Sequence, residues 1–323
     1  MSSAGQTRTM MRSEDSSLAS TLTRIVSPHT IIRRNEPLAR RTTLRVGGPA
    51  DFFVEPGSES DLAEVVRLCA ERRLPFLVLG RGSNLLVRDG GIRGVVISLS
   101  QPHFSRIEVS APRLRCGAGA RLKAVAMEAK RHELTGFEFL EGIPGSVGGG
   151  LRMNAGAMGN EMFEVVESVR VMDFAGAVRE CGAKEMDVSY RVCSTLERLI
   201  ALEAVLAGRP GRRELIERRM HEYSQRRWGS QPASPSAGCI FKNPLTVPAG
   251  RLIEELGLKG ARVGGAWVSA EHGNFIVNDG NATARDILEL IDLIRRRARA
   301  ERGIDLETEV RILGEAGEPA EKN

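Results

Sequence analysis

Two glycine-dense segments constrain what this chain of 323 residues can fold into. Residues 80–84, Gly-Arg-Gly-Ser-Asn, lie between two apolar runs, and residues 142–159 contain seven glycines in eighteen positions. Glycine weakens helices and strands, but it adopts positive φ and lets backbone approach a ligand closely. We therefore expect the second segment to form neither a stable helix nor an ordinary strand.

Each glycine segment has a functional and a purely structural interpretation. Successive amides of residues 80–84 could form an anion-binding concavity, with Ser83 and Asn84 as further donors, or the segment could be a tight loop between strands. It is neither a Walker loop nor a GxGxxG turn that opens a helix. The second segment could be a hinge, but two such segments fit a long dinucleotide lying across two subdomains better.

Composition excludes several classes of protein. Apolar residues make up 41% and charged residues 27%, as in a globular domain, and no run of about 18 apolar residues predicts a membrane span. The net charge is +5, but the 40 arginines are scattered without interleaved aromatics, which argues against nucleic-acid binding. A diffuse positive field could still attract an anionic substrate.

Cysteine usage and the N-terminus predict a cytoplasmic protein. The five cysteines are odd in number and irregularly spaced, without a CxxC or Cys/His metal pattern, so we expect reduced thiols and no metal site. No apolar stretch follows the basic residues at the start of the chain, which argues against a secretory signal.

Hydrophobic periodicity predicts a mixed α+β protein with three structured units. We expect these units at residues 28–98, 99–208 and 209–315, between loose tails at 1–27 and 316–323. Predicted helices include 61–73, 122–131, 213–226 and 249–257, and one that begins after an N-cap at Thr283 with a partial capping box to Asp286. Predicted strands include 76–79 and a final strand at 309–313.

Seven segments together resemble the UDP-N-acetylenolpyruvoylglucosamine reductase (MurB) family. In chain order they are residues 43–50, 80–87, 142–149, 154–156, 190–191, 236–244 and 306–311. The resemblance runs from about residue 35 to residue 314, outside the two predicted tails. It implies two α+β subdomains that together form an FAD-binding domain of the vanillyl-alcohol-oxidase (PCMH) type, followed by an α+β substrate-binding domain.

The resemblance also implies the chemistry. NADPH would reduce FAD, and the flavin would pass hydride to C3 of UDP-N-acetyl-enolpyruvoylglucosamine, giving UDP-N-acetylmuramate for peptidoglycan and cell wall synthesis. No histidine lies in either glycine loop, so we expect non-covalent FAD. The implied cofactor-binding residues are Gly80, Arg81, Gly82, Ser83, Asn84, Leu85, Ile143, Pro144, Gly145, Ser146, Val147, Asn154 and Gly156.

Three residues match the catalytic positions of the family. Arg191 would stabilise the carboxylate of the intermediate, since a guanidinium bonds a carboxylate through two parallel hydrogen bonds. Cys239 stands where most members have serine and would protonate C2, because a free thiol is more acidic than an alkyl hydroxyl. Glu309 is preferred to Glu307 as the C-terminal glutamate, although both would share one side of a strand.

Weaker assignments concern the substrate and the subtype. The candidate substrate-binding residues are Tyr190, Arg227, Lys242, Asn243 and His272. Only 47 residues separate Arg191 from Cys239, which resembles the second type of the family, without the inserted segment whose tyrosine closes over substrate. We expect a monomer. The rival interpretations are another flavin oxidase of this fold and a non-catalytic nucleotide-binding module.

Overall fold

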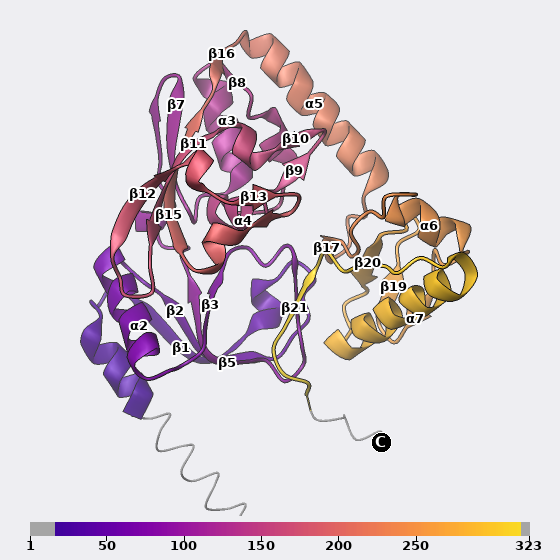
Figure 1. Ribbon diagram of the computed structural model, residues 1–323, viewed down its shortest axis with the longest axis horizontal. Coiled ribbons are helices and arrows are strands. Elements are labelled where there is room, and N and C mark those ends of the chain that lie inside the picture. Colours follow the sequence, from indigo (N-terminus) through magenta and orange to yellow (C-terminus); the bar gives the residue numbers. More distant parts are fainter. Residues whose placement is uncertain (1–16, 318–323) are drawn as a thin grey trace, which may run out of the picture.

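Three β-sheets organise the chain in a computed structural model that describes residues 17–317 (Figure 1). The first sheet has the order β1-β2-β5-β3, the second β12-β11-β15-β7-β6, and the third β17-β20-β19-β18. Helices lie against each sheet, so the protein is mixed α and β. The longest helices are α5 (Arg213–Ser230) and α7 (Ala284–Arg302).

The first sheet combines antiparallel and parallel pairing. β1 is antiparallel to β2, and β5 is parallel to both β2 and β3. Helix α2 (Glu59–Glu71) begins at Ser58, whose side chain accepts a hydrogen bond from Asp61 N. The strands are β1 (Ile31–Pro37), β2 (Pro49–Glu55), β3 (Phe76–Leu79) and β5 (Ile92–Ser98).

The predicted N-terminal tail is too long. Residues 17–25 form a helix, and Leu18 and Leu22 are buried in the main hydrophobic core. The Ser27 amide and hydroxyl donate hydrogen bonds of 2.7 and 2.8 Å to Asp61. Apolar burial and the capping carboxylate therefore hold residues 17–27 on α2. Residues 1–16 and 318–323 lie outside the described part of the chain.

The second sheet is antiparallel throughout. Helix α3 (Leu122–Arg131) has the bounds predicted from the sequence and packs its buried face into the same core. The strands are β6 (Ile107–Ser110), β7 (Arg113–Gly117), β11 (Val166–Met172), β12 (Val178–Gly182) and β15 (Ile200–Ala207).

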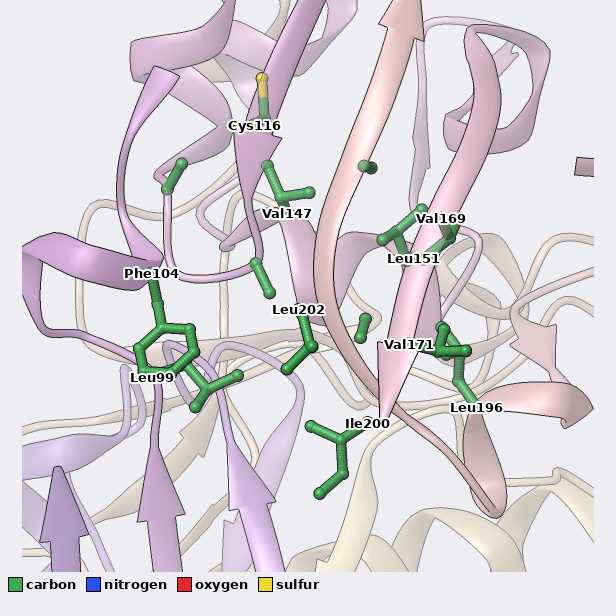
Figure 2. Packing of buried hydrophobic residues seen from close by; sticks show 14 of the residues in the cluster. Leu99, Phe104, Cys116, Val147, Leu151, Val169, Val171, Leu196, Ile200 and Leu202 are labelled. Atoms are coloured by element: carbon green, nitrogen blue, oxygen red, sulfur yellow. The ribbon is translucent and has the colours of Figure 1, made fainter. Parts of the chain in front are cut away.

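The second glycine segment does contain a helix, contrary to the prediction. Helix α4 (Val147–Arg152) includes three consecutive glycines, and its first turn is capped by Ser146. Figure 2 shows Val147 and Leu151 among the buried side chains of the core. A Cβ at Gly148 would lie 3.1 Å from the Ala118 Cβ. Close tertiary packing therefore overrides the low helix propensity of glycine here.

The third sheet carries α6 (Ala249–Glu255) and α7, which surround a separate apolar cluster. Thr283 caps α7 with the predicted capping box to Asp286. Asp89, from the first unit, accepts further hydrogen bonds from Ala284 N and Arg285 N at 2.8 and 2.9 Å. The strands are β17 (Ser236–Cys239), β18 (Arg262–Val263), β19 (Ala266–Val268) and β20 (Phe275–Asn278).

Two connections join the third unit to the rest. Helix α5 leads from the second unit to the third, and the C-terminal strand β21 (Arg311–Leu313) returns to pair in parallel with β4 (Leu85–Val87) (Figure 1). Leu44, Val46 and Leu86 of the first unit belong to the apolar cluster of the third. The third unit therefore shares its core with segments from the start of the chain.

Short elements complete the fold. The remaining strands are β8 (Leu134–Thr135), β9 (Gly156–Ala157), β10 (Asn160–Glu161), β13 (Val188–Ser189), β14 (Val192–Cys193) and β16 (Arg209–Pro210). The 3₁₀ helices are η1 (Leu38–Arg41), η2 (Pro102–Phe104), η3 (Glu138–Gly142), η4 (Met162–Glu164), η5 (Ala183–Glu185) and η6 (Ser194–Glu197).

Candidate active site

A two-residue turn presents the first predicted catalytic side chain. Tyr190 and Arg191 connect β13 to β14, in which Ser189 pairs with Val192. Arg191 has a φ of +61°, a left-handed conformation that is uncommon outside glycine. Its guanidinium lies 4.7 Å from the centre of the Tyr190 ring. Residues other than glycine that have strained backbone are found most often at functional sites. The conformation of Arg191 is therefore consistent with a functional site at this turn.

Arg191 meets the C-terminal glutamate in an ion pair. Its Nε donates to Glu309 Oε1 at 3.1 Å, across 118 positions of sequence. The backbone of Glu309 is fixed in turn, because its amide donates to Ile240 O at 2.8 Å and its carbonyl accepts from Asn84 Nδ2 at 3.2 Å. Asn84 thereby links the first glycine loop to the backbone of Glu309, two residues before β21.

The predicted final strand is too long at its start. β21 begins at Arg311, and the preceding residues make only an isolated bridge, between Thr308 and Phe241. Glu307 is exposed and pairs with Lys242 Nζ at 2.6 Å. The expectation that Glu307 and Glu309 share one side of a strand is therefore wrong. Of these two glutamates, Glu309 is the one that contacts Arg191.

Cys239 lies beside this ion pair at the end of β17, opposite Phe275. The preceding Gly238 has a φ of +76°, which a residue with a side chain would adopt at a cost. Burial and the nearby Glu309 carboxylate raise the pKa of the Cys239 thiol to about 12, against opposing effects from Arg191 and a hydrogen bond with Asn274. The thiol is therefore protonated at neutral pH.

Burial also raises the pKa of Glu309 above its ordinary value, although Arg191 and Lys242 favour the carboxylate. Two neighbouring groups thus hold protons more strongly than they would in water. Arg191, Cys239 and Glu309 come from three separate segments, and the fold brings them together as a cation beside two weak acids. Such a set can bind a carboxylate and deliver a proton next to it.

A further acidic residue at this cluster, Glu161, was missed from the sequence. Glu161, in β10, places Oε1 3.8 Å from Arg191 Nη1, and its Oε2 accepts from Asn154 Nδ2 at 2.7 Å. Asn154 is only 2% exposed, and its amide also bonds Ser189 O and Phe163 N. In the sequence, Glu161 is visible only as an acidic residue that follows the glycine-rich segment 142–159. The Asn154 side chain therefore holds Glu161 and the Ser189 backbone in place next to Arg191.

The two glycine loops lie against each other. A Cβ added at Gly80 would come within 2.9 Å of Ser146 Oγ, and one at Gly145 would lie 4.0 Å from Ser83 Oγ. Gly82 has a φ of +61°, and a Cβ there would meet Arg41 O at 2.5 Å. Glycine at these positions lets the two loops and residues 41–42 pack closely against one another, so that backbone of both glycine segments comes together at one place.

Two arginines lie near each other at these loops: Arg81 belongs to the first loop, and Arg121 forms a backbone bridge with Ser146 of the second. Burial and the charge of Arg121 lower the pKa of Arg81. Within residues 17–317 no ion pair joins either side chain to an acidic residue. Mutual repulsion without a counter-ion favours binding of an anion between them, and a dinucleotide diphosphate has the required charge. The residues present therefore fit the diphosphate of a dinucleotide.

The other predicted cofactor residues have mixed surroundings. The Val147 side chain is fully buried in the core, so only its backbone could meet a ligand. Leu85 pairs with Arg311, Ile143 ends η3, and Pro144 is exposed. A Cβ at Gly156 would lie 2.9 Å from Arg191 Nη1, so this glycine makes room for the Arg191 guanidinium.

The candidate substrate residues divide into two groups. Tyr190 and Lys242 border the Arg191–Glu309 pair, through the ring contact and through an electrostatic effect on Glu309. Arg227 lies at the second glycine loop, because a Cβ at Gly142 would be 3.9 Å from its Cδ. Its pKa is lowered by burial, against the charge of Glu141.

Asn243 and His272 make contacts within the third unit. Asn243 Oδ1 accepts from Ala249 N at 3.0 Å at the start of α6. His272 Nδ1 accepts from Asn274 N at 3.1 Å, and its ring packs edge-on against Phe275. Burial lowers the pKa of His272, which keeps its ring neutral. These bonds give both side chains a role inside the third unit.

The described part of the chain contains no cluster of three or more His, Cys, Asp or Glu side chains able to hold a metal ion. None of the helices within residues 17–317 has both the length and the apolar character needed to cross a membrane.

Comparisons with known proteins match both halves of the chain. An FAD binding domain model matches residues 50–182, and the model of the UDP-N-acetylenolpyruvoylglucosamine reductase C-terminal domain matches residues 231–313. The chain is 47% identical over 287 residues to UDP-N-acetylenolpyruvoylglucosamine reductase from Heliobacterium modesticaldum, covering 88% of this chain and 91% of that protein. It is 44% identical over 286 residues to the same-named protein from Clostridioides difficile, covering 88% and 94%.

A solved structure agrees with these relatives. The crystal structure of UDP-N-acetylenolpyruvylglucosamine reductase from Thermus caldophilus has a TM-score of 0.77 and 40% identity, and covers 88% of this chain and 99% of that one. The fold and the site define an FAD-binding oxidoreductase, with a PCMH-type domain followed by a C-terminal domain. The chain belongs to the UDP-N-acetylenolpyruvoylglucosamine reductase (MurB) family.

Proposed function

We propose that this protein uses NADPH and non-covalently bound FAD to reduce UDP-N-acetyl-enolpyruvoylglucosamine to UDP-N-acetylmuramate, a precursor of peptidoglycan. The observation that carries the proposal is the convergence of Arg191, Cys239 and Glu309 at one site. The reaction adds a hydride to C3 and a proton to C2 of the enolpyruvyl double bond, while NADPH is oxidised. FAD, when bound, supplies the hydride.

The glycine loops and two cations would hold the cofactor. Gly80, Gly82 and Gly145 bring the two loops together, and Arg81 with Arg121 would neutralise the diphosphate. A salt bridge to each phosphate oxygen would also relieve the repulsion between the two arginines. Asn84 then ties this loop to the backbone of Glu309, so cofactor and catalytic residues share one framework.

Arg191 would bind the carboxylate of the enolpyruvyl group and stabilise the negative charge that develops on it after hydride addition. Cys239 would transfer its Sγ proton to C2. The raised pKa keeps that proton in place until a strongly basic carbon is present. Glu309, also with a raised pKa, would orient Arg191 and hydrogen-bond the enol form of the intermediate.

We also propose the subtype, the location and the oligomeric state predicted from the sequence. The region between Arg191 and Cys239 is occupied by β14, η6, β15, β16, α5 and β17, which supports the second type of the family without the tyrosine-bearing insertion. We propose further that the protein is a cytoplasmic monomer with three structured units. Tyr190, Arg227 and Lys242 would contact the UDP-sugar.

Spectroscopy of the purified protein tests this function. We expect a yellow protein whose flavin absorbance is bleached by NADPH and restored by UDP-N-acetyl-enolpyruvoylglucosamine. A protein that does not bind FAD, or a reduced flavin that the enolpyruvyl substrate does not reoxidise, would contradict the proposal.

A further inference from the structure

The Asn154–Glu161 pair has no part in the chemistry described above, yet Glu161 approaches a different nitrogen of Arg191 from the one that bonds Glu309. Glu161 Oε1 is 3.8 Å from Arg191 Nη1, and Arg191 Nε bonds Glu309 Oε1 at 3.1 Å. The guanidinium therefore lies between two carboxylates. We propose that Glu161, held by Asn154, is the positioning residue that fixes the Arg191 guanidinium for the substrate carboxylate.

Asn154 fixes both parts of this arrangement. Its Nδ2 donates to Glu161 Oε2 at 2.7 Å and to Ser189 O at 3.4 Å, the last residue before the Tyr190–Arg191 turn. Its Oδ1 accepts from Phe163 N at 3.2 Å, just beyond β10. Because both amide hydrogens are used and the side chain is 2% exposed, Asn154 couples the β9–β10 hairpin rigidly to the β13–β14 hairpin.

Steric limits act together with the charge. Gly156 pairs with Glu161 across the β9–β10 hairpin, and a Cβ on Gly156 would come within 2.9 Å of Arg191 Nη1. The guanidinium thus occupies a space bounded by the Gly156 backbone, the Glu161 carboxylate and the Tyr190 ring. Arginine has many rotamers, so an ordered guanidinium needs such restraints.

Glu161 and Glu309 contact different nitrogens of Arg191: Glu309 accepts from Nε, and Glu161 faces Nη1. The Glu161 side chain is 38% exposed and the Glu309 side chain 17%. Arg191 therefore has a second carboxylate beside it, apart from the Glu309 that the proposed reaction uses.

This inference rests on the proposed function, and Glu161→Gln tests it. Glutamine retains the acceptor for Asn154 but removes the charge that faces Arg191. We expect flavin reduction by NADPH to be unchanged and reoxidation by UDP-N-acetyl-enolpyruvoylglucosamine to slow about ten- to a hundredfold, since small errors of placement have effects of this size. Glu161→Asp should recover part of the rate. Glu167→Gln in β11, which removes a carboxylate from the exposed Arg113 in β7, is the matched control and should react normally.

A second measurement separates this inference from the function. Arginine-detected NMR should show a restrained Arg191 guanidinium in the wild type and in Glu167→Gln, and faster rotation about Nε–Cζ in Glu161→Gln. A wild-type reoxidation rate or an equally restrained guanidinium in Glu161→Gln would overturn the positioning role. If wild-type protein fails to react with the enolpyruvyl substrate, the proposed function is wrong, and the NMR result still decides how Arg191 is held.

Discussion

The raised pKa of Cys239 can be tested by alkylation of its thiol. A pKa of about 12 in place of 9.0 lowers the thiolate fraction at pH 8 about a thousandfold. A more basic thiolate is also a better nucleophile, with a Brønsted coefficient of about 0.4–0.5. The rate constant of the thiolate itself is therefore about 16- to 32-fold higher, which offsets part of this loss. We therefore expect Cys239 to react with iodoacetamide about 30- to 60-fold more slowly in the folded protein than in urea.

The pH dependence of this reaction is more diagnostic than its rate at one pH. Mass spectrometry of the Cys239 peptide should give a rate that rises about tenfold per pH unit from pH 7 to 10 in the folded protein. In urea the rate should level off near pH 9. A plateau near pH 9 in the folded protein would refute the reasoning, provided that circular dichroism shows an intact fold.

The causes of the shift can be separated by substitution. Glu309 is the second cause after burial, so Glu309→Gln should lower the pKa of Cys239 and accelerate alkylation. Arg191 acts in the opposite sense, and Arg191→Met should slow it further. Equal rates in both variants would mean that burial alone sets the reactivity of the thiol.

Two further predictions concern stability and charge. Because burial disfavours ionised Glu309, the stabilising effect of its protonated form is present below pH 4.5 and is lost as the pH rises through the raised folded pKa. Glu309→Gln should therefore raise the melting temperature at pH 7 but not at pH 4, and a lower melting temperature at pH 7 would contradict this. The same substitution should slow flavin reoxidation by substrate at least about a hundredfold. Asp89→Ala removes the acceptor of two amides at the start of α7 and should reduce the free energy of urea unfolding by about 1 kcal/mol, and an unchanged value would show that water replaces the cap.

The sequence predicted much of the fold because local signals agreed with tertiary packing. The bounds of α3 and the cap of α7 followed from apolar periodicity and from the Thr283 capping box. The prediction for α4 was wrong because three glycines have low helix propensity, whereas their lack of side chains allows the helix to approach Ala118. The helix at residues 17–25 was missed because its stability comes from burial of Leu18 and Leu22 in a core formed by distant segments.

The site could be predicted only as far as its motifs extend. Arg191, Cys239 and Glu309 lie within segments that resemble the family, so their residue types and order were visible in the chain. Glu161 has no such signal, and its contact with Arg191 depends on how two hairpins are placed side by side by Asn154. Asn243 and His272 resembled ligand-binding residues, but their hydrogen bonds stabilise the third unit.

The most direct test of the account is stopped-flow measurement of both flavin half-reactions in wild type and in Cys239→Ala and Cys239→Ser. We predict that NADPH reduces the flavin at the same rate in all three proteins. UDP-N-acetyl-enolpyruvoylglucosamine should reoxidise the reduced flavin in the wild type and in Cys239→Ser, and fail to do so in Cys239→Ala. Reoxidation at the full wild-type rate in Cys239→Ala would contradict the assignment of Cys239 as the proton donor.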